Sequence, residues 1–294
     1  MLVNILTDLV LPGLVAGCIY ALVATGFNVL DISTKTVSFA YGDYIMWAPM
    51  AALIAYSHLH WPAALCIVVG VAVAGGFALL VEYVAVRPFI DKPREFVWIL
   101  STLGASVILQ RAAFLPFNGE QRAFPISLPI GFFRLGVLSF SYQDLLVIAA
   151  AIMVAIGLYV VYRRTRLGRV LVAVGEDPDG ARALGISPEK MSQVSALLAS
   201  VVAAITGLVV APFFLVSPQL GFQLLFIGFT AATFGGLGSI RGGYIGGFVV
   251  GFLIQATGVY GSSEWTYVVV FGTLLVLYSV RPWGIYGVPP IRAV

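Results

Sequence analysis

Charged residues are scarce in this chain. Only 10% of its 294 residues are Asp, Glu, Lys or Arg, whereas an ordinary soluble domain carries about 25%. Apolar residues make up 60% of the sequence, and the mean hydropathy is +1.01. An aqueous fold cannot bury so much apolar surface, so lipid must be the solvent of most of the chain. The net charge of +3 also argues against the basic surface that nucleic-acid binding requires.

The side chains that enzymes and metal sites use are also few. The chain has 2 Cys and 2 His. Cys18 and Cys66 lie inside apolar runs, and no cluster of His or Cys residues with the spacing of a metal site is present. His58 and His60 are not paired with a Ser, a Cys or a metal ligand. We therefore expect inert thiols, no metal, no cofactor and no catalysis.

Motifs for nucleotide binding are missing as well. No Walker A pattern occurs, and no segment between the apolar stretches is long enough for a nucleotide-binding domain. If the chain supports active transport, the energy must come from another subunit or from an ion gradient.

Long apolar stretches dominate what the sequence does contain. A helix needs about 20 mostly apolar residues to cross the hydrocarbon core, and nine stretches reach or approach that length. They lack the alternation of barrel strands, so helices are the only option. We expect a single all-α polytopic membrane domain over 1–294 with eight spans, give or take one. The stretches are 9–30, 36–57, 62–86, 96–116, 143–162, 193–216, 223–239, 243–261 and 265–280.

Two of these predictions need comment. The first stretch lacks the cationic flank and the cleavage site of a signal peptide, so we expect a retained span. The stretches 223–239 and 265–280 are short, and the former is a candidate for a re-entrant segment.

Basic residues cluster in two loops and set the expected orientation. By the positive-inside rule both loops are cytoplasmic. Because successive spans cross the membrane in opposite directions, the N-terminus is then expected outside and the C-terminal tail inside. The segment 117–142 is expected outside, as an ordered cap rich in Pro, Gly and Phe. The basic residues are Arg87, Lys92 and Arg94 in one loop, and Arg163, Arg164, Arg166, Arg169, Arg182 and Lys190 in the other.

The loop at 163–190 contains the signals of a short helix. Asp177-Pro178 is a starting signal and Gly185 a stop signal, which predicts a helix over 179–184. Two interpretations stay open: an ordinary solvated loop with positive-inside arginines, or a docking element for a cytoplasmic partner. Docking would explain why apolar residues are exposed among the charges. These residues are Ala181, Leu184 and Ile186.

The run from Ser38 to Tyr44 places a charge inside an apolar stretch. Asp43 would cost about 2.5–3.5 kcal/mol at the bilayer centre, and the neighbouring Gly42 would permit unwinding where backbone lines a cavity. One interpretation is a substrate pathway lined by Ser38, Tyr41 and Asp43. The other places Asp43 near the cytoplasmic end of the second span, where it is hydrated or paired with Lys35.

Three further polar residues, Glu82, Gln110 and Arg111, fall inside apolar stretches. Glu82 stands about one turn from the expected membrane surface, which favours pairing with Arg87 or snorkelling. Arg111 lies near the outer end of its stretch, where it would either snorkel or face a cavity.

Glycines recur at four-residue spacing near the C-terminal end of the chain. The pairs include Gly238/Gly242 and Gly242/Gly246. Glycines one turn apart let helix backbones approach closely, so tight helix packing is the favoured interpretation. Arg241, which lies among them, is expected in a cytoplasmic-side bend rather than in lipid.

Several sequence motifs follow one another along the chain and together cover most of it. In sequence order they are Tyr20-Ala21-Leu22 with Gly26-Phe27-Asn28; Ser38-Phe39-Ala40-Tyr41-Gly42-Asp43-Tyr44; Arg87-Pro88; Thr102-Leu103-Gly104 through Gln110, with Phe117-Asn118-Gly119; Thr165-Arg166-Leu167-Gly168-Arg169 through Leu184-Gly185-Ile186; and Gly235-Gly236-Leu237-Gly238-Ser239 with Gly242-Gly243 and Gly246-Gly247. In this order they resemble the motifs of the branched-chain amino-acid type of ABC-importer permease, and the Ser38–Tyr44 run is similar to that family's Asn-Phe-Ala-His-Gly motif.

The resemblance implies a fold like that of type II ABC-importer permeases, in the inner membrane of a bacterium. It implies two cytoplasmic ATPase subunits, a second homologous permease in a heterodimer, and an extracytoplasmic solute-binding protein. ATP-driven movement of the ATPases would push on the 163–190 coupling loop and switch the permease between inward-facing and outward-facing states.

The resemblance also implies roles for three sets of residues. Ser38, Phe39, Tyr41, Gly42 and Asp43 would belong to the substrate pathway. Arg169, Glu176, Asp177, Ala181, Leu184 and Gly185 would couple to the ATPases. Gly235, Gly236, Gly238, Gly242 and Gly246 would pack helices. Because Ser38 and Tyr41 stand where the family typically has Asn and His, the cargo stays open between branched-chain or neutral amino acids and a related small polar solute.

A rival hypothesis needs no partner. The chain could work alone as a secondary transporter or channel, with Asp43 or Glu82 as its proton or cation site. An intramembrane enzyme has no support, since no nucleophile, base or metal constellation is present.

Overall fold

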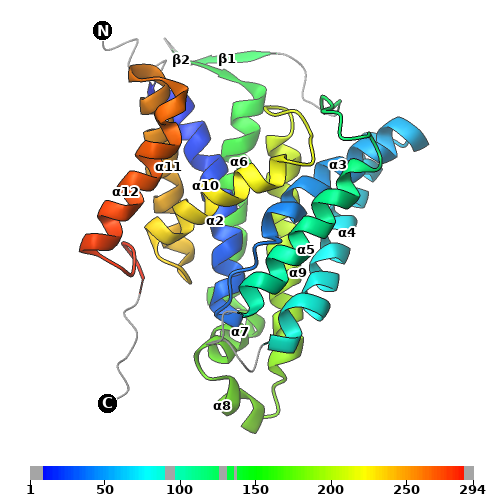
Figure 1. Cartoon of the computed structure of the whole chain (residues 1–294), viewed down its shortest axis with the longest axis vertical. Helices are drawn as coiled ribbons and strands as arrows, with labels where there is room; N and C mark the ends of the chain where they lie inside the picture. Colours follow the sequence, from blue (N-terminus) through cyan, green and yellow to red (C-terminus); the bar gives the residue numbers. More distant parts are fainter. Residues whose placement is uncertain (1–8, 90–96, 126–130, 136–137, 288–294) are drawn as a thin grey trace.

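The computed structural model describes residues 9–89, 97–125, 131–135 and 138–287, and these form a bundle of long helices (Figure 1). Each of the nine expected apolar stretches is a helix, which confirms the helical membrane fold. The helices are α2 (Leu11–Thr34), α3 (Tyr41–Leu59), α4 (Ala63–Val81), α5 (Val97–Phe114), α6 (Tyr142–Arg164), α9 (Pro188–Val210), α10 (Leu220–Gly235), α11 (Ile240–Tyr260) and α12 (Thr266–Val280).

Within the described residues, six of these helices are long and apolar enough to cross a membrane. They are α2, α4 with its extension to Phe89, α5, α6, α9 and α11. The apolar helices α10 and α12 are shorter, with 16 and 15 residues. The helix α3 has 19 residues and is long enough to cross a membrane, but its composition is too polar for this set. About eight spans therefore remains an approximate count.

Two boundaries differ from the expected ones for local reasons. The stretch expected at 193–216 begins earlier, at Pro188, because the Ser187 hydroxyl accepts a hydrogen bond from the Lys190 amide and caps α9. The stretch expected at 223–239 ends at Gly235, because residues 236–239 form a turn. Gly236 and Gly238 adopt φ values of +104° and +76° there, which favour glycine. Asn28 of α2 holds this turn with hydrogen bonds to Gly238 and Ser239.

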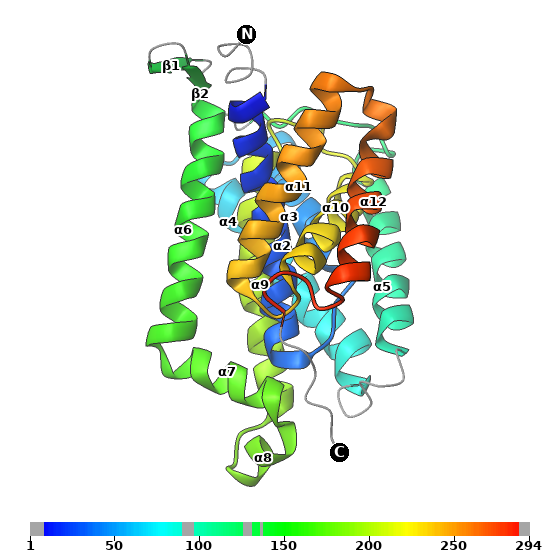
Figure 2. The same ribbon diagram turned by 90° about the vertical axis from the view of Figure 1, so that its left-hand side faces the viewer.

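Short elements gather at the two ends of the bundle. One end carries α7 (Arg166–Glu176), α8 (Pro178–Ala183), a π-helical turn η2 (Glu82–Val86) and a 3-10 turn η3 (Arg87–Phe89). The opposite end carries the paired strands β1 (Phe132–Leu135) and β2 (Leu138–Ser141) and a 3-10 turn η5 (Ser263–Trp265) (Figures 1 and 2). The basic loop residues that the structure describes thus lie at one end, as the positive-inside rule expects. Lys92 and Arg94 lie outside the described residues.

The segment 117–142, expected to be an external cap, contains two strands that were not predicted from the sequence. β1 and β2 are antiparallel, with Phe133 opposite Phe140. Arg122 and Val216 exchange two backbone hydrogen bonds, of 3.0 and 2.8 Å, which tie the cap to the connection between α9 and α10.

The core surrounds α2, which contacts α6, α7, α9, α10 and α11. Glycines of α11 allow the closest of these contacts: a Cβ on Gly247 would collide with the backbone of Ala21, and one on Gly251 with that of Gly17. Gly235, Gly242 and Gly246 lie where α10 and α11 meet backbone to backbone. The peripheral helices instead expose large apolar side chains, as surfaces facing lipid or another subunit do.

Candidate functional site

The 163–190 segment leaves the bundle as two consecutive helices. α6 ends at Arg164, and the Thr165 hydroxyl caps α7 by accepting a hydrogen bond from the Gly168 amide at 3.1 Å. α7 then crosses the end of the bundle (Figure 2). It buries Leu171 and Val174 on its inner face. Gly175 lies so close to the backbone of α2 that a Cβ would collide with the Ile32 carbonyl.

Sequence reasoning missed α7, although its signal was present. The positions 168, 171, 174 and 175 recur at helical spacing and are the buried ones. The surrounding arginines suggested a loop instead. The residues predicted to couple here, Arg169 and Glu176, are both exposed.

The expected helix at 179–184 is α8, displaced by one residue at each end. Asp177 caps it by accepting a hydrogen bond from the Gly180 amide at 2.9 Å, and Pro178 occupies its first position. Gly185 ends it with φ of +80°. The start and stop signals in the sequence therefore correspond to the observed caps.

Of the three apolar residues expected to be exposed around α8, only Leu184 is fully so. Leu184 is 81% exposed, whereas Ala181 is only 5% exposed and Ile186 is half-buried. Ala181 faces inward because α8 packs against both α7 and α9. The expectation that Ala181 is exposed is wrong, and Leu184 is the large apolar side chain that projects from this helix.

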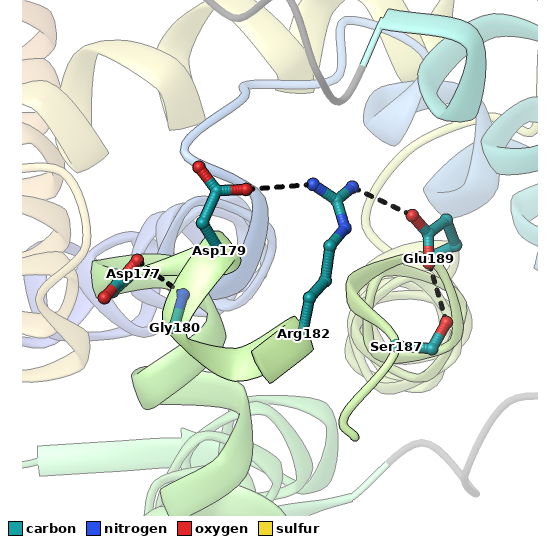
Figure 3. Close-up of polar contacts among 6 residues, drawn as sticks. All are labelled: Asp177, Asp179, Gly180, Arg182, Ser187 and Glu189. Carbon is teal, nitrogen blue, oxygen red and sulfur yellow. Dashed lines mark hydrogen bonds and ion pairs between the residues drawn. The ribbon is translucent and has the colours of Figure 1, made fainter. Parts of the chain in front are cut away.

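An ion-pair network fixes α8 to the start of α9 (Figure 3). Arg182 reaches Asp179 at 3.2 Å and Glu189 at 3.0 Å. The Ser187 hydroxyl donates a hydrogen bond to the second Glu189 oxygen at 2.7 Å. The Arg182–Glu189 pair thus joins α8 to the first turn of α9.

The polar run from Ser38 to Tyr44 lies inside the bundle. After α2 ends, Lys35 adopts φ of +51°, and the chain rises back between the helices before α3 begins (Figure 1). The break thus falls at 35–40, before Gly42 rather than at it. The Phe39 amide donates a hydrogen bond to the Thr102 hydroxyl of α5 at 3.3 Å, which anchors the irregular segment.

Asp43 is 1% exposed, in the first turn of α3. Its carboxylate lies beside the side chains of Ser106 and Gln110 on α5. Neither of its oxygens makes a well-oriented hydrogen bond. The interpretation that Asp43 is hydrated or paired with Lys35 at the cytoplasmic end is therefore wrong, because packing inside the bundle excludes both.

Glycines allow the other residues of this run to pack closely. Gly42 crosses Gly221 of α10 backbone to backbone, and a Cβ on either would collide with the other's carbonyl. Tyr41 is fully buried over Gly26, which leaves room for its ring, and its ring centroid lies 4.8 Å from that of Phe27. Gly42 therefore serves close packing and not unwinding.

The helix α10, which packs against α3, carries several aromatic side chains. Phe39 is half-buried, and its ring lies 5.8 Å from that of Phe229 on α10. On the same helix Phe222 and Phe226 are 45% and 36% exposed, with ring centroids 4.6 Å apart. Sequence reasoning missed these two residues, although their four-residue spacing places them on one helix face.

Glu82 does not snorkel. It is 2% exposed and forms no ion pair with Arg87, whose guanidinium lies over the Tyr83 ring instead. The physical reason is the π-helical turn η2, whose wider spiral changes the register so that Glu82 faces inward and Tyr83 outward. Arg111 is exposed over the Phe114 ring, which agrees with snorkelling.

No group of three or more His, Cys, Asp or Glu residues in the described ranges could hold a metal ion. Cys18 and Cys66 are both buried free thiols. Arg241 is exposed in the first turn of α11, next to the 236–239 turn, as expected of a residue in a bend.

Known permeases resemble the chain, two of them along nearly its whole length. BraD of Pseudomonas aeruginosa, a high-affinity branched-chain amino acid transport system permease protein, is 30% identical over 96% of both chains. LivH of Escherichia coli, described in the same words, is 28% identical over 96% of both chains. A fructose import permease of Rhizobium meliloti, FrcC, is 27% identical over 62% of this chain.

One solved structure supports the fold independently. PsaBC from Streptococcus pneumoniae, in complex with Fab, superposes with a TM-score of 0.50 over 94% of this chain at 12% identity. Residues 9–278 match the family described as branched-chain amino acid transport system / permease component. This chain therefore belongs to the family of branched-chain amino-acid transport permeases.

Proposed function

We propose that this chain is the membrane permease of an ATP-driven importer and forms half of its translocation pathway. The proposed cargo is a branched-chain or neutral amino acid, or a related small polar solute. The observation that carries the proposal is the segment α7–α8, which projects from the basic end of the bundle with Leu184 exposed.

The proposed role of α8 is to receive two cytoplasmic ATPase subunits, one on each permease of a dimer. A large apolar side chain at the tip of a charged segment suits a partner pocket, because its burial there would remove apolar surface from water. The Arg182–Glu189 ion pair gives the pushed helix a connection to α9. Such a connection is what an energy-coupling element requires.

The proposed pathway wall is the surface formed by Phe39, Phe222 and Phe226, which a second permease would face. Aromatic side chains offer apolar contact to aliphatic cargo. In this arrangement the buried Ser38, Tyr41 and Asp43 act by positioning Phe39 and the α3–α10 crossing. The opposite end, with the β1–β2 hairpin, would receive an extracytoplasmic solute-binding protein.

Membership in the permease family favours this function over a stand-alone secondary transporter or channel. The family consists of components of transport systems, and the described residues hold no nucleotide-binding domain. The bacterial inner membrane is the location we propose with it.

The test substitutes Leu184→Asp in a complex co-expressed with the candidate ATPases. We expect loss of ATPase co-purification while the permease stays folded, because a charge would enter an apolar contact. Leu115→Asp is a matched control, since Leu115 is 80% exposed and directly follows α5, in the connection that leads to β1. Normal ATPase binding by the Leu184 variant would refute the docking role of α8. Ala181→Asp is unsuitable, because Ala181 is buried.

A further inference from the structure

A small cavity lies at the α7–α8 end of the bundle, between α2, α4, α9 and the start of α3. Its volume is about 10 Å³, which is the space of one water molecule or one unhydrated ion. Apolar side chains close part of it. The polar side chains that line it are Thr34, Thr36, Ser38, Tyr44, Glu82 and Ser192.

The cavity collects buried polar atoms that lack well-oriented partners. The Glu82 carboxylate oxygens and the Ser38 and Ser192 hydroxyls make no well-oriented hydrogen bond, although Ser192 and Gln193 lie beside the Glu82 carboxylate and Ser38 lies beside the Tyr44 hydroxyl. Glu82, Ser38 and Ser192 are 2%, 5% and 3% exposed. Buried polar groups without partners cost free energy, and several around one cavity indicate a bound species.

The charge and the ligand type of these atoms indicate which species the cavity binds. A buried carboxyl without an ion pair either takes up a proton or binds a cation, and no described side chain forms an ion pair with Glu82. An amino acid does not fit in a cavity of this volume. One carboxylate among hydroxyl oxygens matches a single positive charge with hard oxygen ligands, whereas divalent cations usually take more carboxylates.

We infer that this cavity binds one monovalent metal cation, Na⁺ or K⁺, through Glu82 and the surrounding hydroxyl oxygens. Ser192 lies one turn after Glu189, the residue that joins α9 to α8 through Arg182. The cation therefore links η2, α9 and the irregular segment before α3. Its occupancy favours one arrangement of the docking end relative to the Ser38–Tyr44 run.

The test measures thermal unfolding of the purified full-length chain in NaCl, KCl and choline chloride at equal ionic strength. A ligand that binds only the folded state raises the unfolding midpoint. We expect a saturable rise of about 5 °C at a hundredfold excess over Kd in one of the metal salts. The salt that gives the rise identifies the ion.

Variants assign the effect to the cavity. Glu82→Gln keeps the size of the side chain and should abolish the salt-dependent rise, while Ser192→Ala should raise the apparent Kd about tenfold. Glu264→Gln is the control, because Glu264 is exposed and should retain the full rise. Equilibrium dialysis with ²²Na⁺ or ⁸⁶Rb⁺ should find one saturable site in the wild type.

Two results would overturn the inference: equal midpoints of the wild type in all three salts, or an undiminished rise in both cavity variants. If Glu82→Gln does not fold, Ser192→Ala and the dialysis still decide. The experiment uses no ATPase, so its failure would leave the proposed importer function untouched.

Discussion

The proposed docking segment α7–α8 and the Ser38–Tyr44 run are held in place in opposite ways. α8 is made by neighbours in sequence: Asp177 starts it, Gly185 ends it and Arg182 pairs with Asp179. The Ser38–Tyr44 run is shaped by distant partners on α2, α5 and α10. The exposed part can therefore change without loss of the fold, whereas a change in the buried part reaches three other helices.

The largest expected effect lies in the buried run. Tyr41→Ala should destabilise the chain by about 3–5 kcal/mol, because it removes a fully buried ring and leaves a cavity. Tyr41→Phe should cost far less, since the Tyr41 hydroxyl has no hydrogen-bond partner. Unfolding of the two purified variants by denaturant would measure the difference. Equal losses would show that the hydroxyl matters more than the ring.

The next effect concerns the crossing of α3 and α10. Gly42→Ala should destabilise the protein by about 1–3 kcal/mol and reduce uptake, because the added methyl group meets the Gly221 carbonyl. Gly76→Ala is the matched control, since open space surrounds Gly76 on α4. Thermal unfolding and uptake assays should separate the two variants. A tolerated Gly42→Ala would contradict the close crossing.

The smallest effect on stability is expected in the docking segment. Arg182→Gln should cost about 1 kcal/mol or less, because its ion pairs are partly solvated. Its effect on function should be larger, since the ion pair between α8 and Glu189 of α9 is lost. We expect ATPases to bind normally while ATP-driven uptake falls. Unchanged uptake in reconstituted vesicles would remove this ion pair from the coupling route.

The predictions from sequence were accurate for the locally determined α8 and poor for contacts between residues far apart in the chain. The α8 caps were predicted to within one residue, because Asp177, Pro178 and Gly185 act on the backbone next to them. The inward turn of Glu82 was not predicted, because a single π-helical turn leaves no clear sequence signal. The Gly42–Gly221 crossing joins residues far apart in the chain, and no local pattern reports which glycines meet.

For the Ser38–Tyr44 run, the sequence indicated the segment but not the direction in which its side chains point. The composition of the Ser38–Tyr44 run drew attention to the correct segment, since a charge in an apolar stretch is costly. Whether its side chains face a pathway or a core depends on tertiary packing. That packing buries Tyr41 and Asp43 and leaves Phe39 half-buried.

In the proposed function, the energy for transport enters this permease through α8. Both natural cysteines are buried, so Leu184→Cys would supply a single accessible thiol for cross-linking in the assembled complex. We predict a covalent adduct between this thiol and an ATPase subunit, and none from Leu115→Cys in the connection that follows α5. Failure of Leu184→Cys to cross-link, in a complex that still hydrolyses ATP during uptake, would contradict the account.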